Sequence, residues 1–136
     1  MAVDKVAFEL VAPERLLASI EADMVVIPGA EGDFGVLPQH APFMSLLRPG
    51  VISIYQGDKV DRRVFVAGGF AEVNERGCIV LAEGAEPVEE IQAEAARRTL
   101  RDAEEDLADA KNEAERHRLE RAVEVARARV EAAEAA

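Results

Sequence analysis

Pro87 divides the sequence into two parts of different composition. All nine glycines and all six prolines of the 136-residue chain lie at or before this residue, and residues 88–136 contain neither. Glycine and proline mark turns and strand ends, and both are unfavourable inside helices. The break therefore predicts two domains. Residues 1–87 are rich in turn signals, whereas residues 88–136 are dominated by Ala, Glu and Arg, which favour helix.

The first part has the short segments of a mainly β domain. Gly57-Asp58 separates residues 51–56 from 60–67, and Glu75-Arg76-Gly77 separates residues 70–74 from 78–82, so each turn predicts a β-hairpin. Further strands are expected at residues 6–10, 16–20 and 24–27. In the first two the expected inward-facing side chains are Val6, Phe8, Leu10, Leu16, Ala18 and Ile20. Roughly eight to ten strands over this length suit a β-sandwich or a flattened barrel.

The second part has the apolar spacing of two amphipathic helices. A break at Lys111-Asn112, where Asn favours a turn, predicts that they form an antiparallel helical hairpin. The expected apolar stripes are Ala93, Ala96, Leu100, Ala103, Leu107 and Ala110 in the first helix, and Leu119, Ala122, Ala126, Val130 and Ala133 in the second. Alanine buries little area, so this hairpin is expected to be weakly packed and movable.

Charge differs between the two predicted helices. Acidic residues predominate in residues 88–110, and basic residues predominate in residues 111–130. One interpretation is attraction across the hairpin together with pairs inside each helix. The other is a basic helix that docks on an acidic partner, with Arg116, Arg118 and Arg121 as the docking charges.

Several function classes are disfavoured by composition. The net charge of −11 argues against nucleic acid and against adsorption to an anionic membrane. No apolar run approaches the roughly 18 residues of a membrane span, and the N-terminus lacks a signal pattern, which predicts a cytosolic protein. The single Cys78 is expected to be a buried hydrophobe. No His/Cys cluster has metal-ligand spacing, and His40 has no evident acid partner, so neither a metal, a cofactor nor a catalytic residue is expected.

The most constrained stretch of the first part runs from Ile27 to Pro42, "IPGAEGDFGVLPQHAP". Three glycines and three prolines specify its backbone, which is interpreted as a loop placed for contact. Glu31, Asp33 and Phe34 would then lie at the loop tip. The alternative is an ordinary set of tight turns at one end of a sandwich.

This stretch, followed by "LRPGVI" and "VFVAGGFAEV", resembles the epsilon subunit of the bacterial F-type ATP synthase, whose mitochondrial equivalent is called delta. The resemblance covers the whole sequence. It implies a ten-stranded β-sandwich followed by two helices. It also implies a non-catalytic subunit of the central stalk, which joins the gamma subunit to the c-ring, couples proton flow to ATP synthesis and, in many bacteria, inhibits ATP hydrolysis. Such a subunit lies peripherally at the cytoplasmic face of the inner membrane.

The resemblance also implies site residues. Glu31, Gly32, Asp33 and Phe34 would face the c-ring, and His40, Ala41 and Pro42 would lie near gamma. The C-terminal helices would reach the alpha and beta catalytic subunits. ATP-binding members carry an acid and an arginine where this sequence has Gln92 and Ala95, so no nucleotide binding is expected.

Two other function classes remain open at this point. One is a β-sandwich adaptor with a helical hairpin in an unrelated complex, which would have no affinity for gamma. The other is a small enzyme that uses His40, whose turnover would disappear in His40→Ala.

Overall fold

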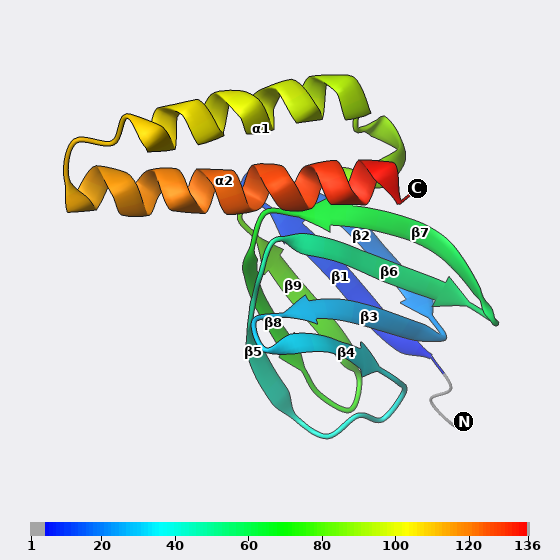
Figure 1. Cartoon of the computed structure of the whole chain (residues 1–136). Coiled ribbons are helices and arrows are strands. Elements are labelled where there is room, and N and C mark those ends of the chain that lie inside the picture. The colour runs from blue at the N-terminus through cyan, green and yellow to red at the C-terminus, as the bar shows by residue number, and fades with distance from the viewer. Residues whose placement is uncertain (1–4, 136) are drawn as a thin grey trace. The chain divides into compact units, whose positions relative to one another are not determined.

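The computed structural model describes residues 5–135, which belong to two compact units, Met1–Pro87 and Val88–Ala136 (Figure 1). The first unit contains ten strands and the second contains the helices. The expected fold, a ten-stranded β-sandwich followed by two helices, is confirmed.

The strands of the first unit form one continuous hydrogen-bonded sheet. Its order is β10-β7-β6-β3-β5-β8-β9-β1-β2. The remaining strand, β4, pairs with the edge of β3 opposite β5 and β6. All pairs are antiparallel except β1 with β9. The bounds are β1 Val6–Ala12, β2 Arg15–Ala22, β3 Met24–Gly29, β4 Gly32–Val36, β5 Phe43–Leu47, β6 Gly50–Gln56, β7 Lys59–Val66, β8 Gly69–Val73, β9 Gly77–Ala82 and β10 Ala85–Pro87.

This sheet folds over itself, so that β1 lies against β3 and β2 lies against β6 across the core. The inward side chains alternate along each strand, as a half-buried sheet requires. The largest fully buried ones are Phe8, Leu10, Ile27, Ile52 and Ile54. Burial of each such side chain stabilises the fold by about 1.5–3 kcal/mol. Both expected hairpins are present, as β6–β7 and β8–β9.

Two strand-level expectations are wrong. The stretch from Ile27 to Pro42 is not one contact loop, because β3 runs on to Gly29 and β4 begins at Gly32, with only residues 30–31 between them. Leu16 does not face the core and is 58% exposed. The β1–β2 register shifts between Leu10 and Val11, so Leu16 pairs with Val11 and points to the outer face.

The second unit consists of a short 3-10 turn, Val88–Glu90, and the helices α1 (Ala93–Ala108) and α2 (Glu113–Glu134). Asn112 caps α2, because its side chain accepts a hydrogen bond of 2.8 Å from the Glu115 N–H. The expected break between the helices is therefore confirmed. No helix in residues 5–135 is long and apolar enough to cross a membrane.

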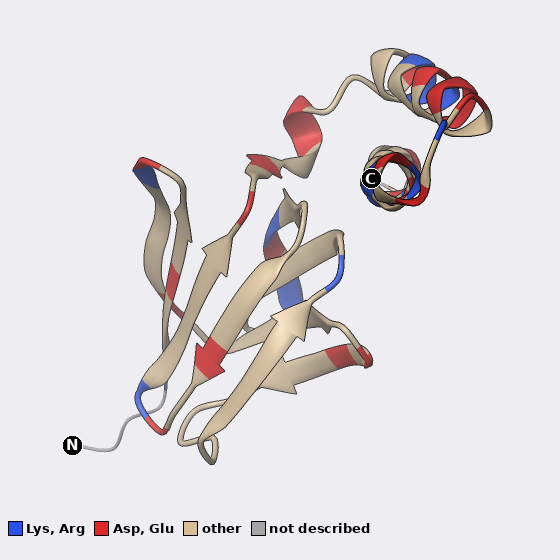
Figure 2. Cartoon of the chain, turned by 90° about the vertical axis from the view of Figure 1, so that its left-hand side faces the viewer, with Lys and Arg blue, Asp and Glu red and all other residues tan. Residues whose placement is uncertain are grey.

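The apolar stripe of α1 follows the expected residues, all of which are buried or half-buried. In α2 the expectation is partly wrong: Ala122 is exposed and Val123 is buried. Ion pairs join the helices, with Arg97 2.9 Å from Glu134 and Arg127 3.3 Å from Glu104. Figure 2 shows both red and blue segments on the helices, which are seen close to end-on, whereas most of the strand ribbon is tan.

Candidate protein-binding surface

The β3–β4 connection presents the first candidate residues. We refer to residues 29–33 as the β3–β4 end. Glu31 occupies the exposed turn, and Gly32, Asp33 and Phe34 form the start of β4. The turn is tight, since a Cβ on Gly29 would lie 2.7 Å from the Gly32 carbonyl oxygen. This geometry explains the glycines that the sequence places here.

Asp33 is already ion-paired in the structure. Its Oδ1 lies 2.5 Å from Nη2 of Arg48, and Nη1 of the same guanidinium donates to the Gly29 carbonyl oxygen at 2.6 Å. The sequence-based expectation placed Glu31 and Asp33 together, as residues of one loop tip that face the c-ring. Their surroundings differ, because Arg48 neutralises only Asp33.

Phe43 links the two sets of candidate residues. Phe34 meets it edge to face, with ring centroids 5.1 Å apart, and the His40 ring lies 6.5 Å from it. Phe34 and His40 therefore both lie next to Phe43, at the start of β5, whereas the turn at residues 30–31 lies beside Leu46, near the end of β5. His40 Nδ1 is 2.7 Å from the Ala41 carbonyl oxygen, which can only accept, so Nδ1 is the donor in this contact.

A larger candidate surface was missed by the sequence reasoning. Five outward-facing apolar side chains form a row across the neighbouring strands β5, β8, β9, β1 and β2. Each lies directly opposite the next in the strand register. The paired residues are Leu46 with Phe70, Phe70 with Leu81, Leu81 with Val11, and Val11 with Leu16. Leu46, Leu81 and Leu16 are 67%, 51% and 58% exposed. We call these five residues the apolar row: Leu46, Phe70, Leu81, Val11 and Leu16.

The apolar row is unusual because the outer face of an antiparallel sheet is normally polar. Contiguous exposed apolar side chains are a common feature of protein-binding surfaces, so the apolar row is a candidate for such a site. Sequence alternation holds a signal for Leu81 and Leu46, since both occupy outward positions where polar residues are expected. No such signal exists for Leu16, because the β1–β2 bulge reverses the face on which it lies.

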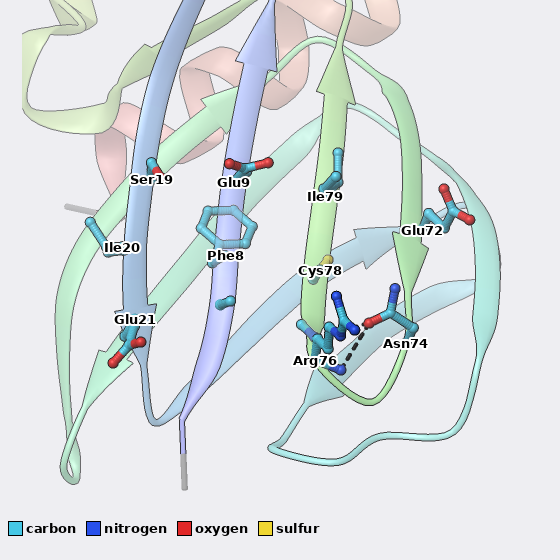
Figure 3. Close-up of a pocket in the computed structure, with 12 residues that line it drawn as sticks. Phe8, Glu9, Ser19, Ile20, Glu21, Glu72, Asn74, Arg76, Cys78 and Ile79 are labelled. Atoms are coloured by element: carbon cyan, nitrogen blue, oxygen red, sulfur yellow. Dashed lines mark hydrogen bonds between the residues drawn. The ribbon is translucent and has the colours of Figure 1, made fainter. Parts of the chain in front are cut away.

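The neighbouring outward row is more polar. It contains Met44, Glu72, Ile79, Glu9 and Ser19 on the same five strands. Figure 3 shows Glu9, Ile79 and Glu72 on three adjacent strands around an open hollow, with Asn74 accepting a hydrogen bond from the Arg76 N–H at 2.8 Å. This acidic border would favour a partner with basic residues beside an apolar strip.

Asp23 and Cys78 have shifted pKa values. Burial raises the pKa of Cys78 to about 12, as befits a thiol that packs as a hydrophobe. A hydrogen bond from Lys5, 2.6 Å away, and one from the Gly57 N–H hold the pKa of Asp23 below its usual range, which ties the start of β3 to the β6–β7 turn. Within residues 5–135, no three His, Cys, Asp or Glu side chains come close enough together to hold a metal ion.

The helical candidates are exposed. Arg116 lies 3.8 Å from Glu113 in the preceding turn, and Arg118 and Arg121 also lie on the surface of α2. Gln92 precedes α1 and Ala95 lies in its first turn, where neither side chain offers a positive charge.

Family comparisons define the class of protein to which this architecture belongs. Residues 5–88 match the model of the β-sandwich domain of the ATP synthase delta/epsilon chain, and residues 94–136 match that of the C-terminal domain of the ATP synthase epsilon chain. The sequence is 53% identical to the ATP synthase epsilon chain of Rhodospirillum rubrum over 121 residues, 89% of this chain and 90% of that one. It is 54% identical to the epsilon chain of Paramagnetospirillum magneticum over 125 residues, 92% and 94% of the two chains. The chain therefore belongs to the ATP synthase epsilon chain family.

Solved structures agree with this assignment. The fold is similar to a chain in the mitochondrial ATP synthase of Euglena gracilis, with a TM-score of 0.82, 26% identity and coverage of 96% of this chain and 82% of that one. A chain of the Tetrahymena thermophila central stalk and c-ring assembly has a TM-score of 0.70 and 16% identity over 96% of this chain and 98% of that one. At that identity the second likeness concerns the fold alone.

Proposed function

We propose that this chain is a rotor subunit of the ATP synthase central stalk, which binds the gamma subunit and the c-ring and couples proton flow to ATP synthesis. The observation that carries the proposal is the apolar row, an exposed strip across five strands. Family membership supports it, and the Euglena relative in fold comes from an assembly of OSCP, F1 and c-ring. The subunit would act at the cytoplasmic face of the bacterial inner membrane, as a peripheral part of F1.

Two surfaces have separate roles in this proposal. The apolar row binds gamma through buried area, which gives a stable contact. The β3–β4 end, with Glu31, faces the polar loops of the c-ring, and His40, Ala41 and Pro42 extend the gamma contact. All of these contacts are non-covalent, so the subunit supplies binding and rigidity to the complex rather than a catalytic group.

Co-purification from detergent-solubilised membranes tests the proposal. We expect the tagged protein to recover gamma and the catalytic subunits in stoichiometric amounts. Recovery of an unrelated complex instead would identify an adaptor, and a stable monomer without partners would contradict both interpretations.

Glu31→Lys should weaken the coupling of proton flow to ATP synthesis. An exposed charge pair contributes about 0.2–1 kcal/mol, so the expected effect is modest and grows at low ionic strength. The measurement is proton-driven ATP synthesis in vesicles that contain the reconstituted complex. Asp58→Lys, at the exposed β6–β7 turn, is the matched control. Equal synthesis rates for both variants and the parent would remove Glu31 from the c-ring contact.

Removal of residues 88–136 should leave the sandwich folded and able to assemble. The proposed contact residues for gamma and the c-ring all precede Val88, and the two units are separately compact. In this proposal the helical hairpin regulates ATP hydrolysis through Arg116, Arg118 and Arg121, which approach the alpha and beta subunits. We expect near-normal synthesis and unchanged or raised hydrolysis in complexes with residues 1–87. A truncated protein that is unfolded by circular dichroism would refute this division of roles.

The isolated subunit should not bind ATP at sub-millimolar concentration. Gln92 and Ala95 supply neither the acid nor the arginine of ATP-binding relatives, and Glu94 would repel phosphate. Isothermal titration calorimetry measures this directly. A saturable heat with one site per molecule would show that other residues bind the nucleotide.

A further inference from the structure

Arg48 connects three separate segments at one end of the sandwich. It follows β5 and precedes β6, and its guanidinium donates to the Gly29 carbonyl oxygen at the end of β3 and to the Asp33 carboxylate in β4. Its backbone N–H also donates to the Pro28 carbonyl oxygen at 3.1 Å. A single residue therefore fastens both strands of the β3–β4 hairpin to the β5–β6 connection.

The backbone of the β3–β4 end is held by the last ladder pair, Gly29 with Gly32, and by the pairing of Gly29 with Leu47 of β5. Its turn contains Gly32 with a φ of +139°, and a Cβ on this residue would contact nothing within 4 Å. The Ala30 N–H donates to the Leu46 carbonyl oxygen at 2.8 Å, which is the backbone link between the turn and β5. The Arg48 guanidinium adds side-chain hydrogen bonds to this backbone framework on both strands of the hairpin, at Gly29 and at Asp33.

The ion pair between Arg48 and Asp33 also makes the electrostatic surroundings of Asp33 and Glu31 different. The Arg48 charge compensates Asp33, whereas Glu31 is exposed at the turn and has no ion-pair partner among residues 5–135. We propose that Arg48 is the positioning residue of the β3–β4 end: it holds the turn in place and neutralises Asp33, so that Glu31 is the carboxylate presented to a basic partner loop. The part that concerns the partner rests on the proposed function.

Arginine is suited to this role because its planar fork donates to two acceptors at once. Lysine would supply the charge for Asp33 but, as a point charge on a flexible stem, would not bridge Asp33 and the Gly29 carbonyl in a fixed geometry. Arg48→Lys therefore keeps the positive charge but loses the bridge, whereas Arg48→Gln loses both.

Amide hydrogen exchange in the full-length protein tests the positioning role without any partner. Arg48→Gln should raise the exchange rate of the Ala30 amide by about three- to tenfold, because a charge-assisted bridge at a partly exposed site is lost. Asp33→Asn should have a similar effect, and the double variant should add little to either single one. Arg48→Lys should restore only part of the protection. Arg63→Gln, at an exposed position of β7, is the charge-matched control. An Ala30 amide that exchanges equally fast in Arg48→Gln and in the parent would overturn the positioning role.

The coupling of proton flow to ATP synthesis in the reconstituted complex tests the part of the proposal that concerns the partner. If the β3–β4 end faces a basic loop, Glu31→Gln and Arg48→Gln should both lower coupling, and Arg48→Lys should recover only part of the loss. A loss in Glu31→Gln with normal coupling in Arg48→Gln would overturn the proposal that Arg48 positions Glu31. Normal coupling in Glu31→Gln would instead refute the proposed c-ring contact, while the exchange result would still decide the role of Arg48 in the turn.

Discussion

Leu81→Glu is expected to abolish stable binding to gamma while the sandwich remains folded. Leu81 occupies the middle of the apolar row, between Phe70 and Val11, and it is 51% exposed in the free subunit. In the complex a glutamate there would be an unpaired carboxylate in an apolar contact, which is costly. A central interface residue of this kind contributes about 2–4 kcal/mol, so affinity should fall by about 30- to 1,000-fold.

The measurement is the equilibrium affinity of the full-length protein for purified gamma, with circular dichroism as the check on folding. Val60→Glu is the matched control, since Val60 is a half-buried apolar residue of β7 outside the apolar row. Equal loss in both variants would point to a general effect of added negative charge. Parent-like affinity in Leu81→Glu would exclude the apolar row as the gamma contact.

Gly77→Ala is expected to destabilise the sandwich strongly. A Cβ at Gly77 would lie 2.0 Å from the Ala7 carbonyl oxygen and 2.8 Å from the Ala7 nitrogen. These are backbone atoms of the paired strand β1, so the contact cannot be relieved by a side-chain rotation. The strands must separate, with a loss of about 2–4 kcal/mol, a large part of the stability of a small domain.

Chemical denaturation of the parent and the variant gives this difference directly. Gly35→Ala is the control, because the nearest atom to its added Cβ would be the sulfur of Met24 at 3.5 Å, an ordinary contact with a flexible side chain. We expect that control to change stability by less than about 1 kcal/mol. Similar losses of stability in both variants would mean that the close approach of the β1 backbone to Gly77 is not the reason for the destabilisation.

Local sequence signals predicted the features that depend on neighbouring residues. Gly57-Asp58 identified the β6–β7 hairpin, the α1 stripe followed helical periodicity, and Asn112 marked the boundary that it caps. Each of these depends on interactions within a few residues, where turn chemistry and periodicity decide the outcome.

Features that depend on distant residues were not predictable in the same way. The outward position of Leu16 results from a bulge in the pairing of β2 with β1. The charge of Asp33 is compensated by Arg48, which lies 15 residues further along the chain. The apolar row exists only when β5, β8, β9, β1 and β2 are placed in register. Resemblance to the family predicted the number of strands, whereas the chemical difference between Glu31 and Asp33 arises from the ion pair with Arg48, which the neighbouring sequence does not indicate.

The parallel pairing of β1 with β9 has a consequence for how the domain forms during synthesis. Ala7 pairs with Gly77, 70 positions later in the sequence, and no shorter connection brings these strands together. Loop closure over such a separation is entropically costly, and contacts of this kind form slowly. Once β1–β2 has emerged from the ribosome, the free edge of β1 must wait for nearly the whole sandwich to be translated. The nascent N-terminal hairpin is therefore the segment most exposed to mispairing, and the helices that follow Pro87 are made after the strand that protects it.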